Sequence, residues 1–264
     1  MVQLSLDCLT LTNTRPADMI RAAAAAGFEL VSLWLAHPAA FPLAELTAAD
    51  AGECARLLED SGVAVYSLEA FDLASEAAIA SYRPAFELGA RLGGKAALAY
   101  NNSIDDPAEV AGLLARFCET AAEFGLASNF EPVAIARTAT LAQAREAIRA
   151  SGADARILFD SWHLMRSGGG LAELRAIEPE LIGYVQLNDG LLANPPEDIV
   201  AEVMGERLYP GTGEFPLVEL LRQTPRHIPW GIEAPSLRRV AAGMSAADQA
   251  RELKAAMGKL LANI

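Results

Sequence analysis

Four side chains of the metal-ligand type close four short apolar runs in the second half of the chain. They are Glu131, Asp160, Gln186 and Glu233, which end the runs NFE, ILFD, YVQ and GIE. A single carboxylate in such a place is as often a helix cap or an ion-pair partner, but four runs in succession that end this way indicate a shared site. Three carboxylates and an amide oxygen brought together would repel one another without a cation. The four residues therefore predict a site for one divalent metal ion, provided that the fold brings them together.

Strand-like and helix-like segments alternate along the whole chain. Eight short runs are apolar on both faces and bounded by Gly, Pro or polar residues, as buried parallel strands are. These runs are residues 3–8, 29–35, 63–69, 95–100, 127–131, 156–160, 181–187 and 230–233. Eight units of about 33 residues each match a (β/α)8 barrel, in which the carboxyl ends of the strands ring one mouth. We therefore predict an α/β fold with a single TIM-barrel domain over residues 1–264, and this fold places the four ligands at the mouth.

Amphipathic helices are predicted between the strands. Apolar side chains recur at spacings of three and four over residues 110–124 and 247–260. Three residue pairs have the spacing of a capping box, which marks a helix start: Thr47 and Asp50, Thr140 and Gln143, and Ser245 and Asp248. The longest irregular stretch is expected at residues 189–216, after the seventh strand. A loop of this length is usually functional, and here it would lie over the mouth.

Composition and charge exclude several classes of protein. Of the 264 residues, 52% are hydrophobic and 21% are charged, and the net charge is -13. A chain this acidic argues against a nucleic-acid partner, because phosphate binding needs a basic surface. Three widely spaced cysteines without a CxxC motif suit a reducing cytosol. The chain shows no secretory leader and no apolar run long enough to cross a bilayer, so we expect a cytoplasmic protein with no membrane partner.

Three features that could indicate other activities fail on chemical grounds. Residues 89–95 spell GxxxxGK, but Ala96 follows in place of Ser or Thr, and the motif leads from a helix into a strand, the reverse of a phosphate-binding loop. Asp160, Ser161 and His163 lie on one turn and cannot supply the geometry of a hydrolase triad. The three lysines lie at a strand start or on the last predicted helix, away from the mouth, and this excludes a Schiff-base aldolase.

Longer runs around the predicted ligands resemble a known family. These runs are Glu131, DSWH at 160–163, YVQLND at 184–189, RLYPGTG at 207–213 and GIE at 231–233. Together they look like the xylose isomerase-like TIM-barrel superfamily of sugar phosphate isomerases and epimerases, and the resemblance covers essentially the whole barrel. It implies one Mn²⁺, Mg²⁺ or Co²⁺ ion held at the ends of strands five to eight. Carried over to this chain, the ligands are Glu131, Asp160, Gln186 and Glu233.

Gln186 departs from the pattern of that family. Most members have histidine at this position, and the change replaces an imidazole nitrogen by a harder amide oxygen. We therefore expect Mn²⁺ or Mg²⁺ to be favoured, with Co²⁺ or Zn²⁺ as alternatives. A glutamine here also resembles the 3-dehydroshikimate dehydratase branch, whose DSFH and VQL motifs are close to those of this chain. A lyase reaction therefore stays open beside isomerisation.

The two glutamates of the predicted metal site are also the predicted acid and base. Glu131 and Glu233 would flank the substrate, one removing the proton next to its carbonyl group and the other returning it. His163 lies one turn after Asp160 and matches a family histidine that binds a substrate oxygen or acts as an acid. A buried, hydrogen-bonded histidine without a catalytic role is the alternative.

Four more residues are predicted to contact the substrate. Arg207 matches a family arginine that contacts substrate hydroxyls, although a solvated loop cation is the alternative. His37, Glu69 and Asn102 follow the second, third and fourth predicted strands, so they face the same mouth. For these three, a purely structural role is equally compatible with the sequence.

We predict a metal-dependent isomerase or epimerase that removes the α-proton of a sugar-like hydroxycarbonyl substrate and forms an enediolate. The first alternative is a lyase on the same metal site, such as a dehydratase of a cyclic keto-polyol resembling the 3-dehydroshikimate or inosose dehydratases. A ligand-binding barrel without catalysis is the second. The endonuclease IV type of the superfamily is excluded, because its three zinc ions need several histidines and this chain has three in all. The resemblance also implies a homodimer or homotetramer.

Overall fold

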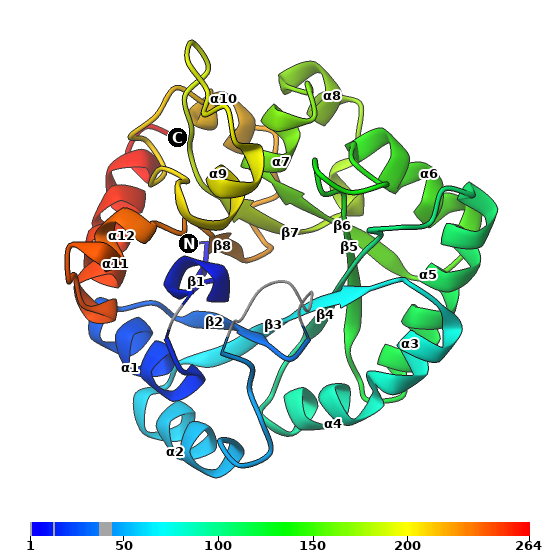
Figure 1. The fold of residues 1–264 in the computed structure, drawn as a ribbon, viewed down its shortest axis with the longest axis horizontal. Helices are drawn as coiled ribbons and strands as arrows, with labels where there is room; N and C mark the ends of the chain where they lie inside the picture. The colour runs from blue at the N-terminus through cyan, green and yellow to red at the C-terminus, as the bar shows by residue number, and fades with distance from the viewer. Residues whose placement is uncertain (1, 13, 37–43) are drawn as a thin grey trace.

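The chain folds into a closed barrel of eight parallel strands with helices around it (Figure 1). The computed structural model describes residues 2–12, 14–36 and 44–264. The strands follow one another around the barrel in sequence order, and β1 (Leu4–Leu6) pairs with β8 (Trp230–Ile232) to close it. This arrangement confirms the predicted (β/α)8 TIM barrel.

All eight predicted strands are present. The other six are β2 (Leu30–Trp34), β3 (Ala64–Asp72), β4 (Ala96–Tyr100), β5 (Ala127–Glu131), β6 (Ala155–Asp160) and β7 (Ile182–Leu187). The strand β5 has the predicted ends, whereas β3 continues three residues past its predicted end at Glu69. Every residue of β7 is buried, because the inner face of a barrel strand packs against the other strands and the outer face packs against helices.

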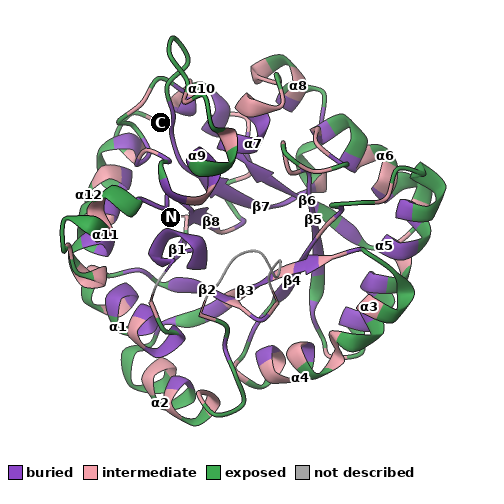
Figure 2. Ribbon diagram, viewed as in Figure 1, coloured by how far each residue is buried: buried purple, intermediate pink, exposed green. Residues whose placement is uncertain are grey.

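Helices cover the outside of the barrel. They are α1 (Pro16–Ala26), α2 (Ala51–Ser61), α3 (Glu76–Ser81), α4 (Arg83–Arg91), α5 (Pro107–Ala122), α6 (Leu141–Ser151), α7 (Ser161–Arg166), α8 (Leu171–Arg175), α9 (Ile199–Gly205), α10 (Leu217–Leu221), α11 (Leu237–Ala241) and α12 (Ala246–Leu261), with 3-10 turns at Cys8–Leu11 and Pro179–Leu181. Figure 2 shows buried residues along the strands and exposed residues on the outer side of the helices. Within the described ranges, no helix combines the length and apolar character needed to span a membrane.

Two of the three predicted capping boxes start helices. Thr140 caps α6 and receives the reciprocal bond from the Gln143 side chain, so this box is complete. The Ser245 hydroxyl accepts the backbone N–H of residue 248 and caps α12. The prediction at Thr47 is wrong, because α2 begins at residue 51. The Thr47 backbone N–H and hydroxyl instead both donate to the Asp50 carboxylate, which forms a turn before the helix.

We predicted that the segment 189–216 is irregular. The structure corrects this in part, because the segment contains the helix α9. Asp189 anchors this segment to the end of β7. Its carboxylate accepts four backbone N–H groups at 2.9 to 3.0 Å, from Gly190, Gly211, Gly213 and Phe215. A backbone bridge between residues 189 and 208 adds a second tie. The segment is therefore held in place over one side of the barrel mouth, and Arg207 is carried on it.

Candidate active site

The four predicted metal ligands lie together at the carboxyl end of the barrel. Glu131 is the last residue of β5, Asp160 is the last of β6, Gln186 lies one residue before the end of β7, and Glu233 follows β8. Asp160 and Gln186 are direct neighbours in the register of β6 and β7. All four side chains are buried, with 0 to 6% of their surface exposed. The fold thus brings together the residues that the strand ends predicted.

Gln186 lies at the centre of this group, with its amide nitrogen among three carboxylates. Its Nε2 lies 3.0 Å from Asp7 Oδ2, 3.2 Å from Glu233 Oε1 and 3.4 Å from Glu69 Oε1, so three acceptors share its two hydrogens. Among the described residues, its Oε1 has no hydrogen-bond partner although it is buried. The amide therefore separates the carboxylates through its nitrogen and keeps its oxygen free.

Arg207 supplies a positive charge to the same group. Its Nη1 lies 3.1 Å from both Asp160 Oδ2 and Glu233 Oε2, and its Nε donates to the carbonyl of Val203. The guanidinium carbon lies 5.1 Å from the centre of the Trp162 ring, within cation–π range. Arg207 is 1% exposed, so it is not the solvated loop cation that we kept as an alternative. Its predicted contact with substrate hydroxyls stays a prediction.

Asp160 is held by more than Arg207. Its Oδ1 accepts the backbone N–H of His163 and so caps α7, while its Oδ2 accepts Asn188 Nδ2 at 2.8 Å. The Asn188 amide is fixed in turn, because its Oδ1 accepts the hydroxyl of Ser161 at 2.9 Å. The DSWH and YVQLND runs of the sequence therefore join in one hydrogen-bonded network below the cavity.

His163 carries its proton on the nitrogen that faces Glu131. Its Nδ1 accepts the backbone N–H of Ala134 at 3.1 Å, so the proton of the neutral ring is on Nε2. Burial lowers the pKa of His163 to about 3, and the ring is therefore neutral at physiological pH. Nε2 lies 3.6 Å from Glu131 Oε1, which is beyond hydrogen-bond distance. His163 Nε2–H can therefore donate a hydrogen bond to a ligand atom in the adjoining cavity, which His163 lines.

Four of the buried carboxyl groups of the site, on Asp7, Glu69, Glu131 and Glu233, have raised pKa values. Burial, with repulsion from neighbouring carboxylates, raises the pKa of Glu69 and of Glu131 well above the usual value. Burial also raises the pKa of Asp7 to about 7 and that of Glu233 to about 8, although Arg207 opposes the second shift. The main cause of these four shifts is burial away from water, and repulsion between neighbouring carboxylates adds to it.

A cavity of about 320 Å³ adjoins this group of side chains. Its polar lining includes Glu69, Asn102, Glu131, His163, Arg207 and Glu233. Its apolar lining includes Trp34, Tyr100, Val133, Ile135, Val200 and Met204. Glu69 is buried, whereas Asn102 is exposed at the edge and its backbone N–H donates to Asp72. His37, which we predicted to contact substrate, lies outside the described residues. The cavity is suited to a ligand with one polar and one apolar side.

The chemistry of the donor atoms fits a hard divalent cation. Five buried carboxyl groups belong to the group of side chains around Gln186 and Arg207: Asp7, Glu69, Glu131, Asp160 and Glu233. The buried carboxylates of Asp189 and Glu202 are satisfied elsewhere, by backbone N–H groups and by Arg166. Arg207 is the only lysine or arginine among the described residues that line the cavity. Among the predicted ligands, two buried oxygens, Glu131 Oε1 and Gln186 Oε1, lack a hydrogen-bond partner in the described ranges. The described residues contain no three His, Cys, Asp or Glu side chains grouped closely enough to hold a metal ion. At this site the carboxylates are spaced by Gln186 Nε2 and by the Arg207 guanidinium, which lie between them.

Asp7 and Asn188 belong to the site but were not predicted. Asp7 directly follows β1 and is fully buried, so the rule that found Glu131 would have found it if applied to the first strand. Asn188 lies within the YVQLND run, but its contact with Asp160 joins residues 28 positions apart. No spacing in the sequence indicates that contact.

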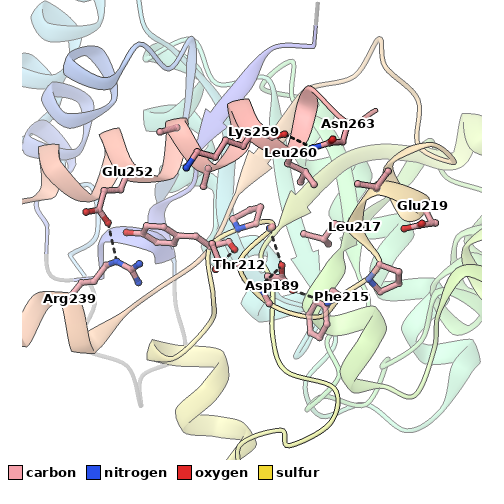
Figure 3. A pocket seen from close by; sticks show the side chains of 18 residues that line it. Asp189, Thr212, Phe215, Leu217, Glu219, Arg239, Glu252, Lys259, Leu260 and Asn263 are labelled. Atoms are coloured by element: carbon pink, nitrogen blue, oxygen red, sulfur yellow. Dashed lines mark hydrogen bonds and ion pairs between the residues drawn. The ribbon is translucent and has the colours of Figure 1, made fainter.

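A second cavity lies outside the mouth, between residues 209–219 and the helix α12. It measures about 640 Å³ and contains none of the predicted site residues. Figure 3 shows Arg239 and Glu252 at one end of it and the Asp189 anchor at its inner wall. The Arg239 guanidinium lies 3.8 Å from the centre of the Tyr209 ring, and its Nε lies 3.5 Å from Glu252. These contacts tie the long segment to α12.

Solved structures with the same fold cover the whole chain. A xylose isomerase-like TIM barrel/4-hydroxyphenylpyruvate dioxygenase fusion protein matches with a TM-score of 0.82 and 20% identity, over 98% of this chain and 42% of that protein. The IolI protein with a bound zinc atom gives 0.79 and 14%, over 98% of both chains. A D-allulose 3-epimerase from Methylomonas sp. in complex with D-allulose gives 0.70 and 16%, over 99% of this chain and 96% of that one. At these identities the matches establish the fold.

The family follows from the sequence match itself. No curated protein sequence matches this chain. A family model described as xylose isomerase-like TIM barrel matches residues 20–259. This range includes all four predicted metal ligands and all the strands except β1. The chain belongs to the xylose isomerase-like TIM barrel family.

Proposed function

We propose that this protein is a metal-dependent isomerase or epimerase that removes the α-proton of a sugar-like hydroxycarbonyl substrate. One observation carries the proposal: five carboxyl groups of the site are buried, Arg207 pairs with only two of them, and a buried oxygen on each of Glu131 and Gln186 has no partner in the described chain. Carboxyl groups buried this close together can all be ionised only with a further cation beside them. They adjoin a cavity large enough for a small substrate.

The residues that would hold the ion are Glu131, Asp160, Gln186 and Glu233. All four offer oxygen atoms, which favours Mg²⁺ or Mn²⁺ over the softer Co²⁺ and Zn²⁺. A bound ion would polarise the substrate carbonyl and offset the negative charge that develops when the α-proton leaves. The zinc atom bound in the IolI structure supports metal binding in this fold.

Glu131 and His163 are the groups with atoms free to act on a substrate. Glu131 Oε1 is buried without a hydrogen-bond partner among the described residues, so it can accept a proton without breaking an existing bond. His163 Nε2–H lies on the same side of the cavity and can donate to a substrate oxygen. Glu233, whose Oε2 is held by Arg207, is the predicted partner that returns the proton. The apolar lining excludes water while the proton is transferred.

Two similar structures support a sugar substrate. They are an L-ribulose 3-epimerase and a D-allulose 3-epimerase, which match 99% and 100% of this chain. We therefore expect ketoses to be the first substrates to test. The assay is incubation with a panel of keto-sugars and Mn²⁺ in D2O, followed by mass spectrometry and NMR. Deuterium incorporation at the carbon next to the carbonyl is the expected result.

Two variants and a control make this assay specific. Glu233→Gln and Glu131→Gln should each abolish exchange while circular dichroism stays unchanged. Glu178→Gln is the control, because Glu178 pairs with Arg149 on the exposed outer surface. Wild-type exchange in the Glu233→Gln variant would show that the proposed proton transfer is wrong. Tight Mn²⁺ binding without exchange into any substrate would instead favour a ligand-binding barrel.

A lyase on the same site is the second candidate, and the state of His163 favours it. After α-proton loss the β-hydroxyl group would leave as water, with its proton supplied by the carboxyl group that took the α-proton, and His163 Nε2–H is a hydrogen-bond donor beside the cavity that can hold the leaving oxygen. The flat apolar lining by Trp34 and Tyr100 also suits a ring, such as a cyclic keto-polyol. Loss of water with a new conjugated-enone absorbance would identify the lyase. Exchange with conserved mass would identify the isomerase.

We also propose that the protein is a homo-oligomer, a dimer or a tetramer. The exposed large apolar side chains of the described chain are Ile135, Leu191, Leu192, Val200 and Leu237. All five lie on segments that follow β5, β7 or β8, on the mouth side of the barrel. Light scattering coupled to gel filtration tests the proposal, and a monomer at micromolar concentration would contradict it.

A further inference from the structure

Gln186 can serve as a metal ligand only if its oxygen, and not its nitrogen, faces the ion. The two ends of a side-chain amide have nearly the same shape, so packing alone does not choose between them. A hydrogen bond to one end does choose. A carboxylate ligand does not need such a bond, because both of its ends are oxygens. A glutamine ligand does, because only one end of its amide can bind a cation.

We propose that Asp7 is the positioning residue that orients the Gln186 amide and so keeps its oxygen available to a cation. The inference rests on the proposed metal-dependent function. Asp7 Oδ2 accepts Gln186 Nε2 at 3.0 Å, the shortest of the three bonds that this nitrogen makes. Glu69 and Glu233 accept the same nitrogen at longer distances. Gln186 Oε1, the other end of the amide, is the atom left without a partner in the described residues.

Asp7 is itself held in the orientation that this role requires. Its Oδ1 accepts the hydroxyl of Ser5 at 2.7 Å and the hydroxyl of Tyr184 at 2.7 Å. These two bonds occupy Oδ1, so Oδ2 is the oxygen that faces Gln186. Ser5 lies on β1, which Asp7 directly follows. Tyr184 lies on β7, which also carries Gln186. The amide is therefore oriented by rigid strand positions and not by a loop.

Gly231 on β8 leaves the space that the Asp7 carboxylate occupies. A Cβ atom at position 231 would lie 2.0 Å from Asp7 Oδ2 and 2.4 Å from the Tyr184 hydroxyl. Both distances are far too short for non-bonded atoms. In the register of the barrel, Gly231 pairs with Gln186 itself. The strand next to the glutamine is thus shaped to admit the carboxylate of Asp7.

The hydrogen bond also has a chemical effect on the ligand. Metal-bound histidines almost always donate their second N–H to a carboxylate or a carbonyl, which fixes the ring and makes the ligand more basic. The Asp7 carboxylate does the same for an amide, because it accepts the N–H of the group whose oxygen would bind the ion. Removing an outer partner of this kind typically weakens metal binding by about 10- to 100-fold.

The test measures Mn²⁺ affinity directly, by electron paramagnetic resonance titration of free Mn²⁺. Asp7→Asn is the main variant, because it keeps the size of the side chain and replaces one acceptor by a donor. We expect it to bind Mn²⁺ about 10- to 100-fold more weakly than the unmodified chain. In a Gln186→Ala background, adding Asp7→Asn should have no further effect, because Asp7 acts through the amide. Asp72→Asn, at the end of β3, is the matched control and should keep full affinity.

Each outcome decides the inference. Equal affinity in Asp7→Asn and the unmodified chain overturns it, and leaves the proposed metal site standing. An equal loss in the Gln186→Ala background also overturns it, since Asp7 would then act by charge alone. If the unmodified chain binds no Mn²⁺, the proposed function itself fails. Tyr184→Phe, which keeps Asp7 but removes one bond to Oδ1, is the second variant if Asp7→Asn does not fold. It should weaken Mn²⁺ binding only when Gln186 is present.

Discussion

Replacement of Arg207 by methionine tests the charge balance of the site most directly. Arg207 Nη1 makes a charge-assisted hydrogen bond of 3.1 Å to each of two buried carboxylates, on Asp160 and Glu233. Breaking a buried ion pair from one side costs about 3–5 kcal/mol, because a charge stays buried without its partner. Burial raises the pKa of Glu233 to about 8, so this carboxyl can take up a proton in compensation. We therefore expect the low end, a loss of about 3 kcal/mol in the free energy of unfolding of the metal-free protein.

The loss should depend on the metal, and this dependence is the test. Urea unfolding followed by circular dichroism is measured after treatment with EDTA and again with saturating Mn²⁺. The ion supplies the missing positive charge, so the loss caused by Arg207→Met should fall to about 1 kcal/mol or less with Mn²⁺. An equal loss in both conditions, or no loss in the metal-free protein, would refute the reasoning.

Arg166→Met is the matched control for that experiment. Arg166 makes two bonds to the buried carboxylate of Glu202, at 2.6 and 2.7 Å, and packs over Phe215. The Arg166 side chain is 10% exposed and also pairs with a buried carboxylate, but neither member of this pair is a predicted metal ligand. We expect a similar loss of stability that is the same with and without Mn²⁺. Metal-dependent recovery of this variant would mean that the effect at Arg207 is not local.

Three further predictions concern the residues around the site. The unfolded chain binds a proton at His163 below pH 6.5, whereas the folded chain does so only below about pH 3, so the free energy of unfolding falls as the pH drops. Between pH 7 and pH 5 the unmodified protein should lose about 2 kcal/mol more of its free energy of unfolding than His163→Gln does, measured by urea unfolding. Parallel pH curves for the two proteins would contradict this. Gly231→Ala should lower the free energy of unfolding by about 1–3 kcal/mol in thermal denaturation, because its Cβ would overlap Asp7; unchanged stability would show that the site can relax. Asp189→Ala removes the acceptor of four backbone N–H groups. Limited proteolysis should therefore cut within residues 189–216 much faster in this variant than in the unmodified protein. An unchanged cleavage pattern would mean that other contacts hold the segment.

The fold could be predicted from the sequence because its strands are buried on both faces. Such strands leave short apolar runs between polar boundaries, and all eight were found with ends within three residues. Helix starts were less certain, since the same residue types also form turns. Thr47 and Asp50 have the spacing of a capping box but bind each other in a turn before α2. The helix α9 was missed because it is short and lies in a segment rich in Gly and Pro.

The sequence could predict most residues of the candidate site, but not the contacts between their side chains. The strand ends indicated Glu131, Asp160 and Glu233, because in a barrel every strand ends at the same mouth. The sequence could not show that Arg207 lies between Asp160 and Glu233, which are 47 and 26 positions away from it. It also could not show which end of the Gln186 amide faces the carboxylates. Both depend on side-chain orientations that the strand pattern does not determine.

The position of Arg207 on the segment 189–216 limits how this barrel can be re-engineered. TIM barrels usually change activity by exchange of the segments that follow their strands, while the strands themselves are kept. Here the barrel and the segments directly after its strands provide the five buried carboxyl groups, and this segment provides the guanidinium between two of them. A chimera that receives a relative's segment without an arginine at position 207 would inherit the acids without their counter-ion. Successful grafts should therefore transfer that arginine together with the loop.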